Sequence, residues 1–111
     1  MIIASLKKKD DNWVAFEVSG HAGYDERGYD IVCAAVSVLA TNTCNGLERI
    51  AKYRPIIDVE EDLGGFLYVE SLANLTQEQQ LITQILIQNF YDGLLDIQEQ
   101  YPEFVTVNIV K

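Results

Sequence analysis

The sequence predicts an α+β fold in which one mainly antiparallel sheet carries two long helices on a single face. Three observations lead to this prediction. Segments with alternating apolar residues occur as two pairs, each pair joined by a short turn. A long segment with helical spacing of apolar residues follows each pair, and a last alternating segment follows the second helix. The predicted order is ββαββαβ, a two-layer sandwich formed by residues 1–111 as one domain.

The first predicted element is a hairpin. Its strands are Ile2–Lys7 and Trp13–Ser19, which flank a polar stretch. In the second strand Val14, Phe16 and Val18 share one face, because side chains alternate along a strand.

A long helix is predicted from Asp30 to Tyr53. Asp30 is a preferred N-cap residue, and Pro55 stops the helix. Apolar side chains fall near helical spacing along it, namely Cys33, Val36, Ala40, Leu47 and Ile50.

The second half repeats the pattern. Ile56–Glu61 and Phe66–Ser71 form a second predicted hairpin, and Thr76 with Gln79 forms a capping box that opens the second helix. Apolar residues at spacings of three and four define that helix, which ends before Pro102: Leu81, Ile82, Ile85, Leu86, Leu94 and Leu95. The last strand, Phe104–Val110, places Val105, Val107 and Ile109 on one face.

The charge balance excludes one class of partner. The chain has 17 acidic and 8 basic residues and a formal net charge of -9. Such a surface repels phosphate, whereas non-specific nucleic-acid binding depends on Lys and Arg that neutralise phosphates. We therefore expect no direct nucleic-acid partner and a surface that favours a cationic one.

Apolar stretches and cysteine content point to a cytoplasmic protein. The longest apolar stretch, Ile31–Ala40, is interrupted by Cys33 and Ser37 and is much shorter than the ~20 residues that span a bilayer. No association with a membrane is expected, and the N-terminal residues lack the pattern of a signal peptide. Two cysteines are too few for a disulfide scaffold.

Two side chains are candidates for a catalytic pair. His21 follows Gly20 at the end of the second strand, and Cys33 lies just beyond a glycine-punctuated loop. If Asp30 is the N-cap, Cys33 is the third helical residue, where unpaired N–H groups and the helix dipole stabilise an anion. A thiol in that environment, beside an imidazole, has a lowered pKa and acts as a nucleophile. The alternative is a structural His21 and a small, buried Cys33.

Other chemistry has less support. Cys33 and Cys44 are eleven residues apart, about 16.5 Å along a straight helix, whereas a disulfide needs Cα atoms within ~7 Å. One histidine and two distant cysteines lack the spacing of zinc ligands. We therefore expect no metal and no cofactor, and we assign Cys44 a structural role.

Supporting residues have open roles at this stage. Asp30 either orients His21 or only caps the helix. Ser37, one turn beyond Cys33, either lines the cleft or bonds back to its own helix. Three tyrosines are either peptide contacts or ordinary half-buried aromatic residues, namely Tyr24, Tyr29 and Tyr91.

A longer pattern surrounds these residues. Gly20-His21-Ala22 is followed by a short glycine-bearing segment and then by Gly-Tyr-Asp-Ile-Val-Cys-Ala-Ala-Val-Ser at residues 28–37. This pattern resembles the signature of the bacterial ribosomal-processing cysteine proteases, the Prp family. The resemblance extends over the whole chain in length and element order, although its specific residues lie between Gly20 and Ser37.

The resemblance implies a cysteine endopeptidase with Cys33 as nucleophile and His21 as general acid and base. The family removes a short N-terminal extension from a large-subunit ribosomal protein, the twenty-seventh, by cutting after a pair of phenylalanines. It also implies a cytoplasmic homodimer and a loop that orders around the peptide. That loop corresponds here to residues 22–29, whose candidate substrate contacts are Ala22, Gly23, Tyr24, Gly28 and Tyr29.

Two other hypotheses belong to different functional classes. The chain could be a non-catalytic, ribosome-associated module that binds a peptide while Cys33 only packs. It could also be a thiol redox sensor, which the spacing of Cys33 and Cys44 disfavours. The reactivity of the Cys33 thiol separates an enzyme from a binding module.

Overall fold

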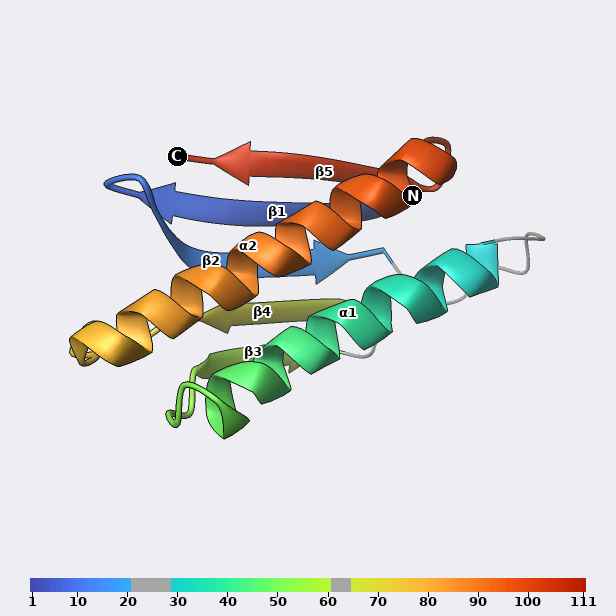
Figure 1. Cartoon of the computed structure of the whole chain (residues 1–111). Coiled ribbons are helices and arrows are strands. Elements are labelled where there is room, and N and C mark those ends of the chain that lie inside the picture. The colour runs from blue at the N-terminus through green and yellow to red at the C-terminus, as the bar shows by residue number, and fades with distance from the viewer. Residues whose placement is uncertain (21–28, 61–64) are drawn as a thin grey trace.

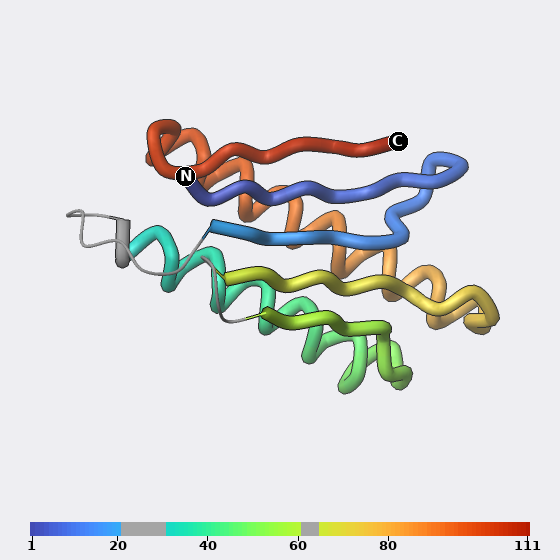
Figure 2. The backbone as a smooth tube through the Cα atoms, turned by 180° about the vertical axis from the view of Figure 1, so that it is seen from behind, coloured from blue at the N-terminus to red at the C-terminus, as the bar shows by residue number. Residues whose placement is uncertain are grey.

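The computed structural model describes residues 1–20, 29–60 and 65–111, with only the backbone described for residues 29 and 30. Both helices lie across one face of a single sheet, and the view from behind shows the opposite face of that sheet (Figures 1 and 2). The predicted α+β sandwich and its ββαββαβ order are confirmed. The elements are β1 (Ile2–Lys9), β2 (Asn12–Ser19), α1 (Tyr29–Arg49), β3 (Ile56–Glu60), β4 (Phe66–Glu70), α2 (Gln77–Gln100) and β5 (Val105–Val110).

The sheet is mixed. Its five strands lie in the order β3-β4-β2-β1-β5, an order that the sequence did not predict. The β1–β2, β2–β4 and β3–β4 pairs are antiparallel, whereas β5 pairs with β1 in parallel. The parallel pair arises because α2 returns the chain to the end of the sheet at which β1 begins (Figure 1). This order makes β3 and β5 the edge strands.

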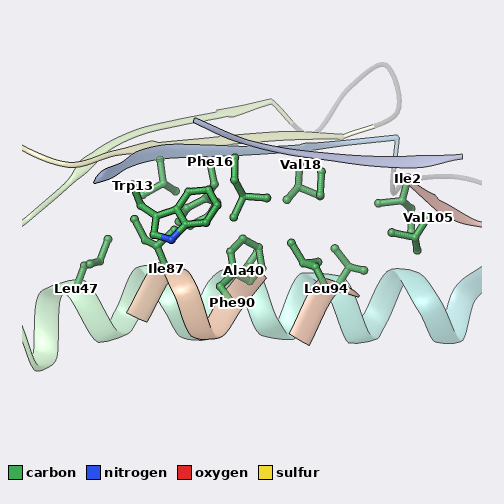
Figure 3. Close-up of a cluster of buried hydrophobic side chains, with 14 of the residues drawn as sticks. Ile2, Trp13, Phe16, Val18, Ala40, Leu47, Ile87, Phe90, Leu94 and Val105 are labelled. Atoms are coloured by element: carbon green, nitrogen blue, oxygen red, sulfur yellow. The ribbon is translucent and has the colours of Figure 1, made fainter. Parts of the chain in front are cut away.

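The core fills the space between the sheet and the two helices (Figure 3). At its centre the rings of Phe16 on β2 and Phe90 on α2 lie 4.7 Å apart, centroid to centroid, at an angle of 57°. Tilted aromatic pairs of this kind add to the free energy gained from burial alone. Helix α1 contributes one buried stripe, made by Val32, Val36, Ala40 and Leu47.

A bulge changes which residues of β2 enter the core. The pairing of β1 with β2 shifts between Lys7 and Lys8, and Val14 is the extra residue on β2. Trp13 is buried beside Phe16 as a result, whereas Val14 is only partly buried. The bulge interrupts the simple alternation that predicts Val14 on the same face as Phe16 and Val18.

Helix α1 ends earlier than predicted. Its last residue is Arg49 rather than Tyr53, because Lys52 adopts a left-handed conformation with φ of 66° and turns the chain before Pro55 is reached. Ile50, which falls near helical spacing in the sequence, is consequently outside the helix and 56% exposed.

Helix α2 begins as predicted. Thr76 accepts a hydrogen bond from the N–H of Gln79, and the Gln79 side chain accepts one from the N–H of Thr76. This reciprocal capping box satisfies donors that a helix start otherwise leaves unpaired.

The buried stripe of α2 differs from the predicted one. It consists of Thr83, Ile87, Phe90 and Leu94, whereas Leu81 and Ile85 are 61% and 58% exposed. Thr83 tolerates burial because its hydroxyl hydrogen-bonds to the Tyr53 hydroxyl and donates to the carbonyl of Gln79. Because one residue of the buried stripe is polar, the spacing of apolar residues alone did not show which side of α2 faces the core.

The last strand is close to its prediction. Val105 is buried and Val107 partly buried, whereas Ile109 is 42% exposed at the free end of the edge strand. Phe104 and Ser71 lie just outside β5 and β4, a difference of one residue that is common at element ends. Glu61, the predicted end of the third strand, lies outside the described residues.

The aromatic contact between the layers predicts a large loss of stability on truncation. Phe90→Ala should lower the free energy of unfolding by about 3–5 kcal/mol, because it opens a cavity against Phe16. Ile85→Ala on the same helix should change it by less than about 0.5 kcal/mol, because Ile85 is exposed. Denaturant unfolding of both variants measures the difference, and equal effects would contradict the assignment of the buried stripe.

Candidate active site

Cys33 lies near the start of α1, at one end of the sandwich (Figure 1). At that end β2 and β3 finish and β4 begins, so that Ser19, Phe66 and Glu60 are paired side by side across the three strands. We call this end, marked by these three residues, the site end. The chain leaves β2 at this end, after Ser19, and α1 begins here, four residues before Cys33.

The Cys33 side chain is partly buried and packs against the core. It is the fifth residue of α1, not the third, because the helix begins at Tyr29. Helical side chains tilt toward the helix N-terminus, so the sulfur is directed over the first turn, where the dipole favours an anion. The thiol is therefore held by the core without being sealed beneath it.

Several predicted site residues lie outside the described part of the chain: His21, Ala22, Gly23, Tyr24 and Gly28. The backbone of Tyr29 and Asp30 forms the start of α1, which places Asp30 inside the first turn rather than before it. The side chains of these two residues are also outside the description.

Ser37 lies on α1 one turn beyond Cys33 and is partly buried. It lines a shallow depression on the outer side of the helix together with Val38, Thr41, Asn42 and Asn45. The structure thus places Ser37 and Cys33 on neighbouring turns of one helix.

Gly20 shows why glycine precedes His21. Its φ of +82° belongs to the left-handed region. A Cβ at this position would lie 2.3 Å from the backbone oxygen of Met1, and the Gly20 N–H donates a hydrogen bond of 3.3 Å to the carbonyl of Gly65. Glycine is therefore required here for two reasons. The chain leaves β2 in a left-handed conformation, and the backbone of Met1 lies too close for a side chain.

Cys44 differs from Cys33 in its surroundings. Both cysteines lie in α1 and no disulfide joins them, as the spacing predicted. Burial, with a further contribution from the negative charge of Glu48, raises the pKa of the Cys44 thiol above its ordinary value. Cys44 is therefore a poor nucleophile. Within residues 1–20, 29–60 and 65–111, no group of three or more potential metal ligands comes together.

Basic residues are concentrated at the end opposite to the site end. Apart from Arg27, which lies outside the described ranges, every lysine and arginine is found in the half of the sandwich where β1 and α1 finish. These residues are Lys7, Lys8, Lys9, Arg49, Lys52, Arg54 and Lys111. The sequence alone did not reveal this, because the topology brings together three distant segments.

The helix-free face of the sheet is acidic toward the site end. Glu17 and Asp58 flank Tyr68 across neighbouring strands. The Tyr68 hydroxyl donates a hydrogen bond to Glu70, which is the main reason that the pKa of Tyr68 is raised to about 12, followed by burial and by the charges of Glu70 and Glu17. Tyr68 therefore remains a neutral donor within an anionic surface.

Comparison with known proteins supports one family. A family model described as cysteine protease Prp matches residues 1–106. The ribosomal processing cysteine protease Prp of Bacillus subtilis (strain 168) is 34% identical over 113 residues, covering 99% of this chain and 100% of the relative. The protein of the same name from Staphylococcus aureus is 30% identical over 109 residues, covering 97% of this chain and 98% of the relative.

Solved structures share the fold over nearly the whole chain. A crystal structure from Streptococcus mutans superposes with a TM-score of 0.90 at 36% identity and covers 99% of this chain and 94% of its own. The S. aureus ribosomal processing protease Prp in complex with a substrate peptide gives a TM-score of 0.85 at 25% identity, with 98% and 99% coverage. The matches in sequence, family model and fold agree, and the chain belongs to the Prp family of ribosomal processing cysteine proteases.

Proposed function

We propose that this protein is the cytoplasmic endopeptidase that removes the N-terminal extension of the twenty-seventh protein of the large ribosomal subunit. Cys33 is the nucleophile and His21 the general acid and base. The observation that carries the proposal is the partly buried Cys33 in the first turns of α1, at the same end of the sandwich as Gly20, the residue before His21.

The proposed reaction proceeds through a thioester. His21 takes the proton of Cys33, and the thiolate attacks the scissile carbonyl carbon, whose oxygen becomes an oxyanion near the N-terminus of α1. As the C–N bond breaks, His21 gives the proton to the leaving amine. Water then hydrolyses the thioester and restores the thiol. An S. aureus relative crystallised with a covalently linked product peptide accords with such an intermediate.

Other residues of the signature complete the proposed site. Residues 22–29 form the substrate loop, and Asp30 and Ser37 support the pair from the first and third turns of α1. Asp30 is proposed to orient His21, and Ser37 offers a hydroxyl one turn beyond Cys33. A ribosomal protein is basic, and the described lysines and arginines of this chain all lie at the end opposite to the site end. The local charge therefore supports this substrate class.

Removal of either member of the pair should abolish cleavage. Cys33→Ala and His21→Ala should each reduce kcat/KM by about 10³-fold or more on a peptide that spans the extension, because the nucleophile or its base is lost. Cleavage is followed by mass spectrometry. Cys44→Ala is the matched control and should retain activity. Undiminished cleavage by a folded Cys33→Ala or His21→Ala variant would contradict the proposal.

Selective alkylation distinguishes an enzyme from a module that only binds a peptide. At about pH 6.5, iodoacetamide should label Cys33 at least tenfold faster than Cys44, because burial and Glu48 raise the pKa of the Cys44 thiol. Peptide mapping with Cys33→Ala and Cys44→Ala as references assigns the label. Equal and slow labelling of both thiols would favour the binding module.

We also propose that two copies associate through the outer face of α1. The helix carries no charged residue from Ile31 to Leu47, although it lies at the surface of a strongly acidic protein. Ile31 and Val38 on its outer side are 67% and 66% exposed. The same helix is long and apolar enough to cross a membrane by composition, yet its inner stripe is buried in the core. Two acidic copies repel each other least when they associate through an uncharged surface such as this helix face.

The dimer has a direct test. Val38→Glu should raise the dissociation constant by at least tenfold, because it buries an unpaired charge between the copies. Ile85→Glu on α2, with similar exposure, should leave association unchanged. Sedimentation velocity of both variants gives the mass. A wild-type protein that remains monomeric at micromolar concentration would contradict the interface.

A further inference from the structure

The outer edge of β3 is open. β3 is the last strand of the sheet, and within the described ranges no strand pairs with its outer side. All five of its residues are exposed, including Ile57 at 43% and Val59 at 54%. An open edge presents unpaired N–H and C=O groups, and extended peptides bind proteins by adding a strand to such an edge.

This edge leads away from the site end. Glu60, the last residue of β3, pairs with Phe66, and Phe66 pairs with Ser19, two residues before His21. Two strand spacings separate Glu60 from Ser19, about 10 Å. An extended substrate that leaves the site along this edge reaches Glu60 first and Asp58 next.

The side chains of β3 favour a cationic occupant. Asp58 and Glu60 point to the same face as Glu17 and Tyr68, whereas Ile57 and Val59 point to the helix side. Opposite charges that lie directly across two neighbouring strands stabilise their pairing. Every described lysine and arginine lies at the other end, so none competes for these carboxylates.

The same charges disfavour a second copy of β3 as the occupant. Two identical β3 strands paired around a twofold axis would bring Asp58 and Glu60 of each copy close to those of the other. Like charges in that arrangement are destabilising, which is a common way to protect an edge from self-association.

We propose that β3 is a docking strand for a Lys- and Arg-bearing segment of the substrate at a distance from the scissile bond. The proposal rests on the proposed function. The segment forms a sixth strand beside β3, its cationic side chains lie opposite Asp58 and Glu60, and its apolar side chains cover Ile57 and Val59. β3 thereby contributes to substrate selection at a distance from Cys33.

Charge recognition is tested with two peptides and two double variants. One peptide spans the extension and the basic segment, and the other has glutamine in place of each Lys and Arg of that segment. D58N/E60Q should raise KM about three- to tenfold for the basic peptide, with kcat within twofold, and should leave KM for the neutral peptide unchanged. E78Q/D92N removes the same charge from exposed positions on α2 and should change neither value. Equal effects of D58N/E60Q on both peptides would overturn charge docking.

Strand addition is tested with the wild-type enzyme. Two basic peptides carry one N-methyl group each, on adjacent residues of the segment. Only alternate N–H groups of an added strand face β3, so one peptide should show a raised KM and the other an unchanged one. If KM is raised for both N-methylated peptides, or unchanged for both, strand addition is overturned.

Three further outcomes distinguish a failure of the docking strand from a failure of the proposed function. If wild-type enzyme cleaves the neutral peptide while the charge and methylation effects are absent, the docking strand is wrong and the proteolytic function stands. If folded wild-type enzyme cleaves neither peptide, the proposed function itself fails. A change in the sedimentation mass of D58N/E60Q relative to wild type would assign β3 to an interface between copies and overturn the proposal.

Discussion

Burial of one stripe of α1 is the constraint on which the site depends. Val32 and Val36 are 1% and 0% exposed between the sheet and α2, and each buried valine side chain contributes about 1.5–3 kcal/mol. Because Cys33 follows Val32 directly, the packing of Val32 fixes the direction in which Cys33 leaves the helix axis. It also fixes the height of Cys33 above the end of the sheet. The proposed nucleophile, Cys33, is therefore positioned by the core rather than by a loop, whereas its proposed partner, His21, belongs to the glycine-bearing segment of the sequence.

The fold class was predictable because the evidence for it is local. Alternation, helical spacing and the Thr76 capping box each involve residues a few positions apart. The errors arose where a non-local fact decided the outcome. The Val14 bulge depends on pairing between two strands, and the buried Thr83 depends on the Tyr53 hydroxyl from another part of the chain. Neither partner can be identified from periodicity.

In the candidate site, too, the local features could be predicted from the sequence and the non-local features could not. The Gly-His and Val-Cys patterns are contiguous in the sequence, and they indicated the chemistry before any contact was known. The conformation that Gly20 must adopt was not visible, because it results from the approach of Met1, the residue that leads into β1. The acidic character of the site end could not be predicted either, since Glu17, Asp58 and Glu60 become neighbours only through the strand order β3-β4-β2.

Distance and screening decide how the net charge of this protein should be interpreted. The molecule is 44 Å long, whereas charges in physiological salt are screened over about 8 Å. The two ends therefore act almost independently, and a partner responds to the end that it contacts rather than to the total of -9. The lysine-bearing end offers no advantage to a basic polypeptide, and the site end does. The same sequence composition with its lysines placed beside Cys33 would lack this charge separation, so it is the topology, more than the composition, that suits this enzyme to the cationic substrate proposed for it.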